Sequence, residues 1–263
     1  LDTPFVYHID GDGKETGQYP RRRGAFRLGI DLPKLSQLIL NTPDAPKARG
    51  YRKAFDPLSG EEKWAVEFPH HWNGGVLATQ GGLVFQGNSL GEFSAYSAAT
   101  GDLLWTSNAY RGFIAPPVSY MVDGIQYVAI LAGTGGESGI VGDAGPASEK
   151  YRNEGLLLVY KLDGAVAMPM PLDRNQDIPV QPGIAASTSE IERGERLYNQ
   201  SCLRCHGFFA HSSGVVPDLR MMDEATRRDF KVIVRDGLLR LKGMPGFAGQ
   251  LTDRDIDQIR AYI

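Results

Sequence analysis

The chain has 263 residues, a formal net charge of −3, and a composition of 42% hydrophobic and 22% charged residues. This length accommodates two domains with separate hydrophobic cores, and the composition is ordinary for a globular protein. The acidic balance leaves no basic stripe that neutralises phosphates, which excludes nucleic acid as the main partner. No apolar run approaches the roughly 20 residues that cross a bilayer, so we expect no transmembrane segment.

The first fifty residues carry few structural signals. The opening letters, LDTPFVYHID, fit neither a start methionine nor a signal peptide, and we expect the chain to be part of a longer protein. Three consecutive arginines at positions 21–23 indicate a solvated or partner-facing loop. A short helix is predicted near Leu35–Leu40.

Two later segments repeat each other. Ala54–Trp64 and Ala95–Trp105 share an alanine, an aromatic residue, a Ser/Thr-Gly pair and a final tryptophan, at an offset of 41 residues (95 minus 54). That period suits a four-stranded propeller blade. The alternative is a chance match between two core tryptophans of a β-sandwich. The repeat predicts that Trp64 and Trp105 occupy equivalent positions in adjacent blades, each packed against the neighbouring blade's backbone.

Short β-rich runs surround the repeat. Strands are predicted at Val76–Thr79, Leu83–Gln86 and Glu92–Tyr96, and Asp123-Gly124 predicts a hairpin turn. Gly155–Gly164 adds one more strand. About two and a half blades cannot close a ring. We therefore expect residues 1–164 to leave open sheet surfaces, which another polypeptide or segment covers.

The composition changes after residue 164. Four spaced prolines predict an extended linker over residues 165–188. Helical periodicity follows over residues 189–263. Ser189 is the predicted N-cap of the first helix, and Asp223 that of a second helix that ends at Gly237. Thr252 and Asp255 predict a capping box at the start of a third helix.

Both cysteines of the chain lie in one motif, Cys202-Leu-Arg-Cys205-His206. A disulfide framework needs more cysteines and a zinc site needs four ligands, whereas C-x-x-C-H is the attachment pattern of a c-type haem. The two thiols then bind the haem covalently and His206 ligates the iron. The carbonyl of Pro217 is expected to accept the Nδ1 proton of His206 and so fix the tautomer.

The second axial ligand is expected further along the chain. Met244 stands in a Gly-Met-Pro loop between two predicted helices, where the backbone can approach the haem face. Met221 and Met222 are the competing candidates, although they run into a helix start and are expected to pack in the core. His211 lies too close to His206 in sequence to cross easily to the opposite face.

Four stretches in this order carry a resemblance to a known family: GYRKAFDPLSGEEKW, HHWNGGVLATQGGLVFQGNSLGEFSAYSAATGDLLW, GIQYVAILAGTGG, and CLRCHG…GVVPDLR…GMPGFAG. Over about residues 50–263 the chain resembles the C-terminal part of quinohaemoprotein alcohol dehydrogenases. The resemblance implies a partial, all-β eight-bladed propeller (its last blades) followed by a small all-α cytochrome c domain.

The resemblance also implies cofactor contacts. Trp72 and Asn73 correspond to residues at the floor of the pyrroloquinoline quinone (PQQ) site, with Asn73 contacting a quinone oxygen through its backbone. Thr134 stands where the family has another cofactor-contacting residue that is often larger or apolar. The Ca²⁺ ligands, the catalytic aspartate, a lysine and a vicinal disulfide of the family lie upstream of these stretches, so no catalytic residue is assigned here.

Two hypotheses about function follow. In the first, the chain is part of an alcohol-oxidising periplasmic enzyme whose cofactors are PQQ, Ca²⁺ and haem c. It oxidises a small alcohol to an aldehyde or ketone, and electrons leave through the haem to a soluble acceptor such as a blue copper protein or a cytochrome. In the second, the chain is purely an electron carrier, a cytochrome c fused to a β-rich docking module without substrate chemistry.

Overall fold

The computed structural model describes residues 41–43, 49–68, 70–135, 145–174 and 177–263. The helix predicted at Leu35–Leu40 and the three arginines at 21–23 lie outside these residues. The chain divides into a β-rich unit, mostly within residues 46–175, and a helical unit, mostly within residues 176–263. We describe each unit by itself.

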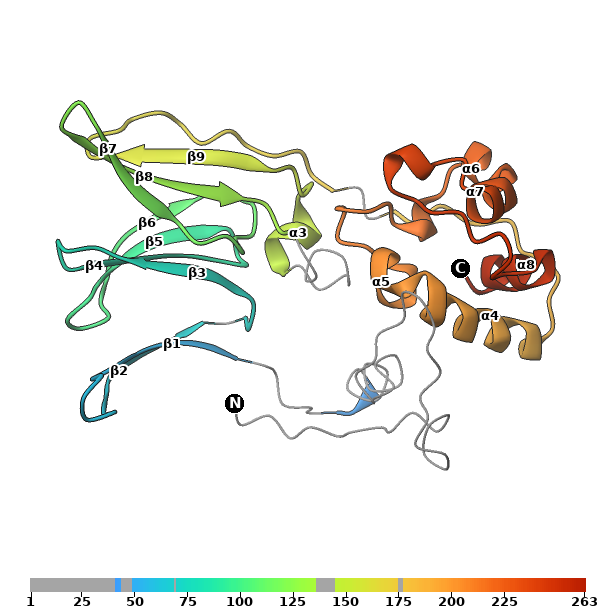
Figure 1. Ribbon diagram of the computed structural model, residues 1–263, viewed down its shortest axis with the longest axis horizontal. Coiled ribbons are helices and arrows are strands. Elements are labelled where there is room, and N and C mark those ends of the chain that lie inside the picture. The colour runs from blue at the N-terminus through green and yellow to red at the C-terminus, as the bar shows by residue number, and fades with distance from the viewer. Residues whose placement is uncertain (1–40, 44–48, 69, 136–144, 175–176) are drawn as a thin grey trace. The chain divides into compact units, whose positions relative to one another are not determined.

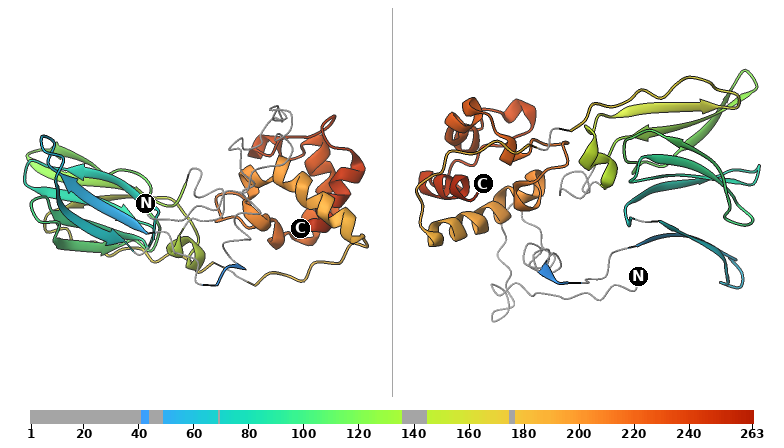
Figure 2. Two further views of the ribbon diagram at one scale, coloured as in Figure 1. Left: turned by 90° about the horizontal axis from the view of Figure 1, so that it is seen from below. Right: turned by 180° about the vertical axis from the view of Figure 1, so that it is seen from behind.

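The β-rich unit consists of three antiparallel sheets that follow one another in chain order (Figures 1 and 2). Within each sheet, neighbours in sequence are neighbours in space, as in the blades of a propeller. The first sheet has two described strands, the second four and the third three. The strands are β1 (Gly50–Phe55), β2 (Glu62–Phe68), β3 (Asn73–Ala78), β4 (Leu83–Asn88), β5 (Glu92–Ser97), β6 (Leu103–Asn108), β7 (Val118–Val122), β8 (Ile125–Ala132) and β9 (Leu156–Lys161).

The two repeated tryptophans occupy equivalent positions, as predicted. Ala54 pairs with Trp64 across β1 and β2, and Ala95 pairs with Trp105 across β5 and β6. Each pairing is followed by a register shift at the next residue of the first strand. Because both the residues and the irregularity recur, β1–β2 correspond to the last two strands of the complete blade β3–β6.

The surroundings of the two indoles are only partly alike. Trp64 Nε1 donates to the carbonyl of Ala98 at 3.0 Å, and its ring lies against Gly101, where an added Cβ would be 2.8 Å away. This is the predicted contact with the neighbouring blade's backbone. Trp105 instead packs edge-on against the ring of Tyr160 at 5.3 Å and is 41% exposed. For Trp105 this ring contact stands in place of the predicted backbone contact, although β9 also ends in a turn, in which Gly164 N–H donates to the carbonyl of Lys161 at 3.1 Å.

This difference predicts unequal costs for two matched substitutions. Trp64→Phe should lower the free energy of unfolding by about 1 kcal/mol more than Trp105→Phe, since only Trp64 loses a hydrogen bond to a carbonyl. Urea denaturation of the full-length protein measures both values. Equal losses would show that the contact with Ala98 contributes nothing.

The hairpin turn predicted between β7 and β8 is confirmed. Asp123 and Gly124 have φ angles of 51° and 77°, the positive values that a type I′ turn requires. Between the second and third sheets lies a buried core centred on Phe93, Phe113 and Ile130. The other side of the third sheet exposes apolar side chains, in agreement with the open surface expected there. They include Val118, Tyr120, Val122, Leu131, Leu157 and Val159.

The segment predicted as a linker (165–188) is extended and free of helix or ladder strands in its described residues up to Ser187, and its last residue, Thr188, already belongs to the first helix of the helical unit. Its first part is hydrogen-bonded to the β-rich unit, where Arg111 donates to the carbonyl of Pro169 and Arg152 N–H to that of Leu172. Its last part is bonded within the helical unit, where Gln181 donates to the carbonyl of Arg220.

The helical unit contains five α-helices among its described residues (Figure 1). They are α4 (Thr188–Ser201), α5 (Leu203–His206), α6 (Glu224–Arg228), α7 (Phe230–Asp236) and α8 (Asp253–Tyr262). Caps at Asp223, Gly237 and Thr252 are confirmed, and Gly237 has the left-handed φ of 71° that ends α7. The helix predicted from Asp223 is interrupted at Asp229, whose ψ of 3° separates α6 from α7.

The sequence predicted Ser189 as the N-cap of α4, but the structure shows that the N-cap is Ser187. Glu190 lies three residues after Ser187, and its carboxylate accepts from the backbone N–H of Ser187 at 3.1 Å. That reciprocal bond forms a capping box, which places the start of the helix two residues earlier.

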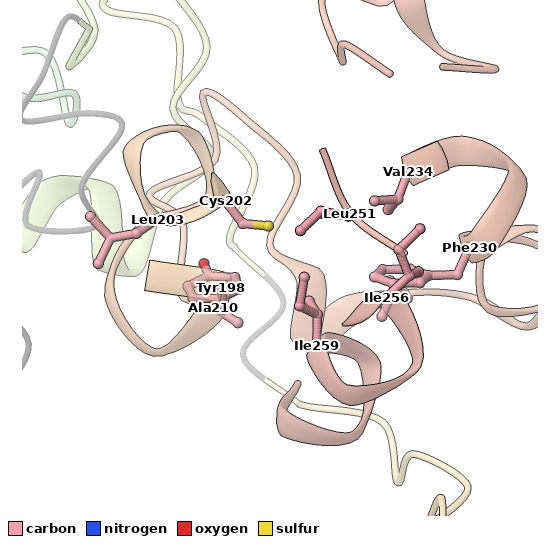
Figure 3. Packing of buried hydrophobic residues seen from close by; sticks show 10 residues of the cluster. Tyr198, Cys202, Leu203, Ala210, Phe230, Val234, Leu251, Ile256 and Ile259 are labelled. Carbon is pink, nitrogen blue, oxygen red and sulfur yellow. The ribbon is translucent and has the colours of Figure 1, made fainter. Parts of the chain in front are cut away.

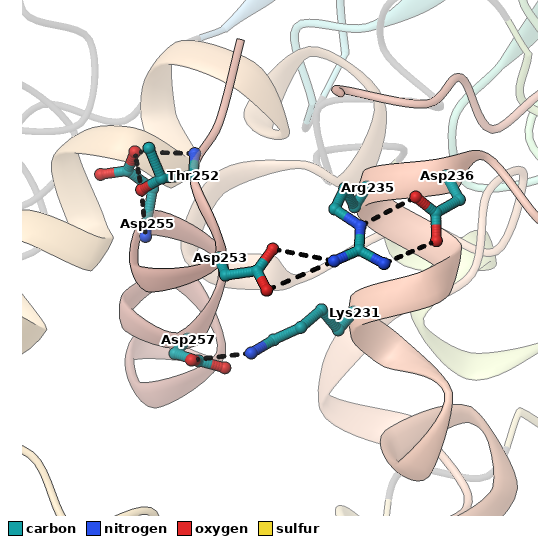
Figure 4. A network of polar contacts seen from close by, with 7 residues as sticks. All are labelled: Lys231, Arg235, Asp236, Thr252, Asp253, Asp255 and Asp257. Carbon is teal, nitrogen blue, oxygen red and sulfur yellow. Dashed lines mark hydrogen bonds and ion pairs between the residues drawn. The ribbon is translucent and has the colours of Figure 1, made fainter. Parts of the chain in front are cut away.

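Helices α4, α7 and α8 enclose the core of this unit (Figure 3). Its members include Tyr198, Cys202, Phe230, Val234, Leu251, Ile256 and Ile259. On the surface, α7 and α8 are joined by ion pairs (Figure 4). Arg235 binds Asp236 at 2.8 Å and Asp253 at 3.1 Å, and Lys231 binds Asp257 at 2.9 Å. All five side chains are solvent-accessible, so water screens each pair and its contribution to stability is small.

Candidate functional site

The two cysteines lie where α4 turns into α5. Cys202 is the C-cap of α4 and is buried, whereas Cys205 is exposed, and neither thiol forms a disulfide. Burial raises the pKa of Cys202 to about 12 in the unmodified chain, which disfavours the thiolate that a zinc site needs. Within the described residues, no group of three or more His, Cys, Asp or Glu side chains could hold a metal ion. Two free thiols on consecutive turns suit thioether attachment of a haem.

His206 is held in an orientation that suits an axial ligand. Its ring is 6% exposed, and Nδ1 lies 2.9 Å from the carbonyl oxygen of Pro217, which confirms the predicted contact. Nδ1 therefore carries the proton and donates it to that carbonyl. Burial lowers the pKa of His206, so the imidazole is neutral. Nε2 is buried without a hydrogen-bond partner among the described residues. A neutral imidazole with a free, buried Nε2 is the form that binds haem iron.

The three candidate methionines lie in different environments. Met222 is 7% exposed and belongs to the hydrophobic core, and its carbonyl accepts from Arg227 at 2.7 Å. Met221 is half-buried at the end of a short 3₁₀ turn. Met244 is half-buried as well and packs against the same core as Cys202. This position leaves Met244 the expected sixth ligand.

The Trp-Asn-Gly-Gly stretch begins strand β3. Its two glycines permit a close approach of backbone, since a Cβ at Gly75 would lie 2.7 Å from Pro116 and one at Gly74 would lie 3.1 Å from the carbonyl oxygen of Ala115. The pairing of β3 with β4 shifts register between Asn73 and Val76. The glycines therefore serve packing, and they leave an irregular strand start.

Asn73 has an unused acceptor at this strand start. Its Nδ2 donates to the carbonyl of His70 at 3.1 Å, while Oδ1 is buried without a partner among the described residues. Next to it, the rings of His71 and Trp72 lie 5.1 Å apart, and those of His70 and His71 are stacked at 4.6 Å. A buried acceptor beside an aromatic group fits the floor of a planar, polar cofactor.

Thr134 is connected to the start of β3 through the segment that contains Phe113 and Ile114. Gly75 N–H donates to the carbonyl of Ile114, and Phe113 forms a bridge with Gly133. The Thr134 hydroxyl, however, lies 2.8 Å from that of Ser148, and Thr134 N–H donates to Asn153 at 2.8 Å. Nothing in the sequence pattern had singled out Asn153 or Ser148, because both depend on packing of distant segments.

Comparisons with known proteins agree with this division. Residues 66–128 match the family described as glucose/ethanol/alcohol dehydrogenase, beta-propeller domain. Residues 189–263 match the family described as cytochrome C oxidase, cbb3-type, subunit III. Among the described residues, no helix has both the length and the apolar character needed to cross a membrane.

Relatives that match most or all of this chain include quinohaemoprotein alcohol dehydrogenases. The chain is 35% identical to quinohemoprotein alcohol dehydrogenase ADH IIB of Pseudomonas putida over its full length, which is 36% of that relative. The solved structure of ADHIIG from Pseudomonas putida HK5 has a TM-score of 0.74 and 38% identity, over 81% of this chain and 31% of the other. The quinohemoprotein alcohol dehydrogenase of Comamonas testosteroni has a TM-score of 0.68 and 32% identity, over 84% and 32%.

The chain thus spans about a third of the length of the curated relatives it matches. Along this chain the match to the propeller family precedes the match to the cytochrome family. The chain therefore corresponds to the C-terminal part of the quinohaemoprotein alcohol dehydrogenases.

Proposed function

We propose that the chain is the part of a PQQ- and haem c-containing dehydrogenase that completes the propeller and carries the electron exit. The whole protein would oxidise an alcohol to an aldehyde or ketone. One observation carries the proposal: a buried His206 with a free Nε2, beside two free thiols, lies in the same chain as a Trp-Asn-Gly-Gly propeller strand. The proposal is supported by similarity to a quinohaemoprotein alcohol dehydrogenase that extends over the whole of this chain and over 36% of that relative.

Each candidate residue then has a role. Bound PQQ supplies a quinone that takes up two electrons, and haem c supplies an iron centre that passes them on singly. Cys202 and Cys205 would hold the haem, and His206 would offer Nε2 to the iron while the carbonyl of Pro217 fixes its tautomer. Met244 would be the second residue to bind the iron. Trp72 and Asn73 form part of the PQQ floor, where Asn73 presents its backbone and its free Oδ1.

Thr134 contributes less directly. We place it at the rim of the same floor, where its hydroxyl bonds Ser148 and its amide group bonds Asn153. In this arrangement Thr134 fixes the loop after β8, and a cofactor contact would come from its backbone neighbours. The smaller side chain, compared with the larger apolar residue of many relatives, would leave room for a bulkier group above it.

The residues named above do not include the Ca²⁺ ligands or a catalytic base. We place the Ca²⁺ ligands and the catalytic aspartate in an upstream segment or polypeptide that closes the ring. That same part would cover the apolar surface of the third sheet. We propose a periplasmic location and a soluble acceptor, either a blue copper protein or a cytochrome.

The experiment is anaerobic mixing of the oxidised, full-length protein with a small primary alcohol in the absence of any external acceptor. Haem reduction should appear in the visible spectrum of the PQQ-loaded protein, and should be lost when PQQ is omitted. Ascorbate serves as the control, since it reduces the haem in both samples. Reduction by ascorbate but never by any of a panel of alcohols would favour the alternative, a pure electron carrier with a β-rich docking module.

Covalent haem is the simplest prediction to check. The pyridine haemochrome spectrum should be of c type, and the haem should stay with the protein during acid-acetone extraction, because two thioether bonds hold it. Cys202→Ser/Cys205→Ser should release the haem into the solvent. A haem that is extracted from the wild-type protein would contradict the assignment of both cysteines.

A further inference from the structure

Arg52 is a buried cation between the first and second sheets of the β-rich unit. Its side chain is 7% exposed, with the guanidinium carbon 3.7 Å from the ring centre of Tyr96 and 5.0 Å from that of Phe68. Nε donates to Oε1 of Gln86 at 2.6 Å. Among the described residues, the two terminal nitrogens of Arg52 are buried and have no hydrogen-bond acceptor.

The repeat shows what the same place holds one blade later. Phe93 lies 41 positions after Arg52 (93 minus 52), the offset that relates Trp105 to Trp64. Phe93 packs against Tyr160 of the next sheet at 5.3 Å, as Arg52 packs against Tyr96. The two contacts between neighbouring sheets thus have matching positions. The first has the guanidinium of Arg52 where the second has the aromatic ring of Phe93.

The partner of Arg52 differs in the same way. Gln86 pairs with Ser94, two residues before Tyr96, and Ile130 pairs with Leu158, two residues before Tyr160. Ile130 therefore occupies the place of Gln86 in the next interface. It lies in one buried core with Phe93. A polar pair, Arg52 and Gln86, stands in the first interface where the second has an apolar pair.

Stability alone does not account for the polar pair. Burial of a guanidinium is costly unless its donors are satisfied, and it lowers the pKa of Arg52. Buried ion pairs and polar pairs can usually be replaced by apolar residues of similar volume without loss of stability. The second interface shows that this fold accepts such an apolar pair at the same place.

The amide nitrogen of Gln86 indicates a role in positioning the backbone. Its Nε2 donates to the carbonyl oxygen of Gly74 at 2.6 Å. Gly74 follows Asn73 at the irregular start of β3, where the ladder with β4 is interrupted. The side chain of Gln86 thus replaces a missing ladder bond, and Arg52 Nε orients its amide by holding Oε1. On the other side, Gly50 of β1 lies against Asn73, since a Cβ there would be 2.5 Å from Nδ2.

We propose that Arg52 and Gln86 are positioning residues for the cofactor floor, which they serve by fixing the Gly74-Gly75 peptide directly after Asn73. The inference rests on the proposed function, because it assigns to Asn73 a place under PQQ. Arg52 fixes the amide of Gln86, and Gln86 fixes the carbonyl of Gly74. The backbone directly after Asn73 is thereby anchored, which limits the orientations open to Asn73 itself. Neither side chain has to touch the cofactor.

Gln86→Glu in the full-length protein is the sharpest test. A glutamate keeps an acceptor for Arg52 and improves its charge balance, but it cannot donate to the Gly74 carbonyl. We expect the apoprotein to melt at or above the wild-type temperature. PQQ affinity, titrated with the apoprotein in the presence of Ca²⁺, should weaken about tenfold, as for the loss of one buried hydrogen bond. The absorption spectrum of bound PQQ should also shift.

A second variant and a control complete the test. Arg52→Phe/Gln86→Ile reproduces the apolar pair of the next interface, so it should fold well and still bind PQQ more weakly. Lys53→Met removes an exposed neighbour whose ammonium group pairs with Glu62 at 2.7 Å, and it should leave PQQ affinity and spectrum unchanged. Wild-type affinity and spectrum in both interface variants would overturn the positioning role and leave the proposed function intact. Failure of the wild-type protein to bind PQQ would overturn both.

Discussion

Replacing Gly194 with alanine is expected to destabilise the helical unit by about 3 kcal/mol, even though alanine favours a helix more than glycine does. Gly194 lies in α4 where this helix crosses α8. A Cβ at this position would be 2.0 Å from the carbonyl oxygen of Gln258 and 2.6 Å from its carbonyl carbon. These are backbone atoms, so neither helix can relieve the overlap by rotating a side chain.

Two opposing effects can be compared directly. Alanine gains about 1 kcal/mol of helix propensity over glycine. The overlap forces α4 and α8 apart and loosens the packing of Tyr198, Ile256 and Ile259, which are all fully buried. Overpacking of this kind costs about 1–3 kcal/mol, and more where backbone must move. The steric cost therefore exceeds the gain in propensity.

Guanidinium denaturation of the full-length protein, followed by the haem absorption of the helical unit, measures the effect. Gly183→Ala is the matched control, since nothing lies within 4 Å of a Cβ there and its φ is not positive. It should leave the midpoint within error of the wild type. A Gly194→Ala protein as stable as this control would show that α4 and α8 do not cross at such close range.

The haem motif was predictable because its residues are local. Cys202, Cys205 and His206 lie within five residues, and the helix geometry of α4 and α5 then fixes how they face. The contact of His206 with Pro217 spans only 11 residues. Even the error at the start of α4 was avoidable, since Glu190 stands in the capping-box position relative to Ser187 and not to Ser189.

The β-rich unit was predictable where it repeats and not where the repeat is broken. The offset of Trp64 and Trp105 correctly predicted that they occupy equivalent positions in two neighbouring sheets, where each pairs with the matching alanine. The same offset places Arg52 where Phe93 stands, which is a signal in the sequence that a buried position had become charged. The contact of Arg52 with Gln86 was not predictable, because it depends on how two sheets face each other across 34 residues of chain.

The second expected result with a large effect concerns Met244. Met244→His should keep the haem covalently attached, since both cysteines remain, and convert the iron to two histidine ligands. A thioether favours ferrous over ferric iron, so its loss should lower the midpoint potential by a sizeable part of the roughly 0.8 V that axial ligands span. The weak far-red charge-transfer band that marks methionine ligation should disappear.

The structure supports this choice through the loop that carries Met244. The loop is closed at its base, where a Cβ at Gly246 would lie 3.0 Å from the amide nitrogen of Gly237. Gly243 has a φ of 94°, and Met244 N–H donates to the carbonyl of Leu239 at 3.3 Å. These constraints fix the backbone at Met244 and leave its side chain against the core that contains Cys202.

Spectroelectrochemistry of the full-length protein gives the potential, and the competing methionines provide the controls. Met222→Leu should keep the far-red band, because Met222 is already a core residue whose side chain is replaced by one of similar volume. Met221→Leu should keep it too. Electron transfer from reduced PQQ should slow in Met244→His as the driving force shrinks, while the affinity for alcohol is unchanged. If the far-red band survives in Met244→His but vanishes in Met221→Leu or Met222→Leu, the methionine that ligates the iron is not Met244.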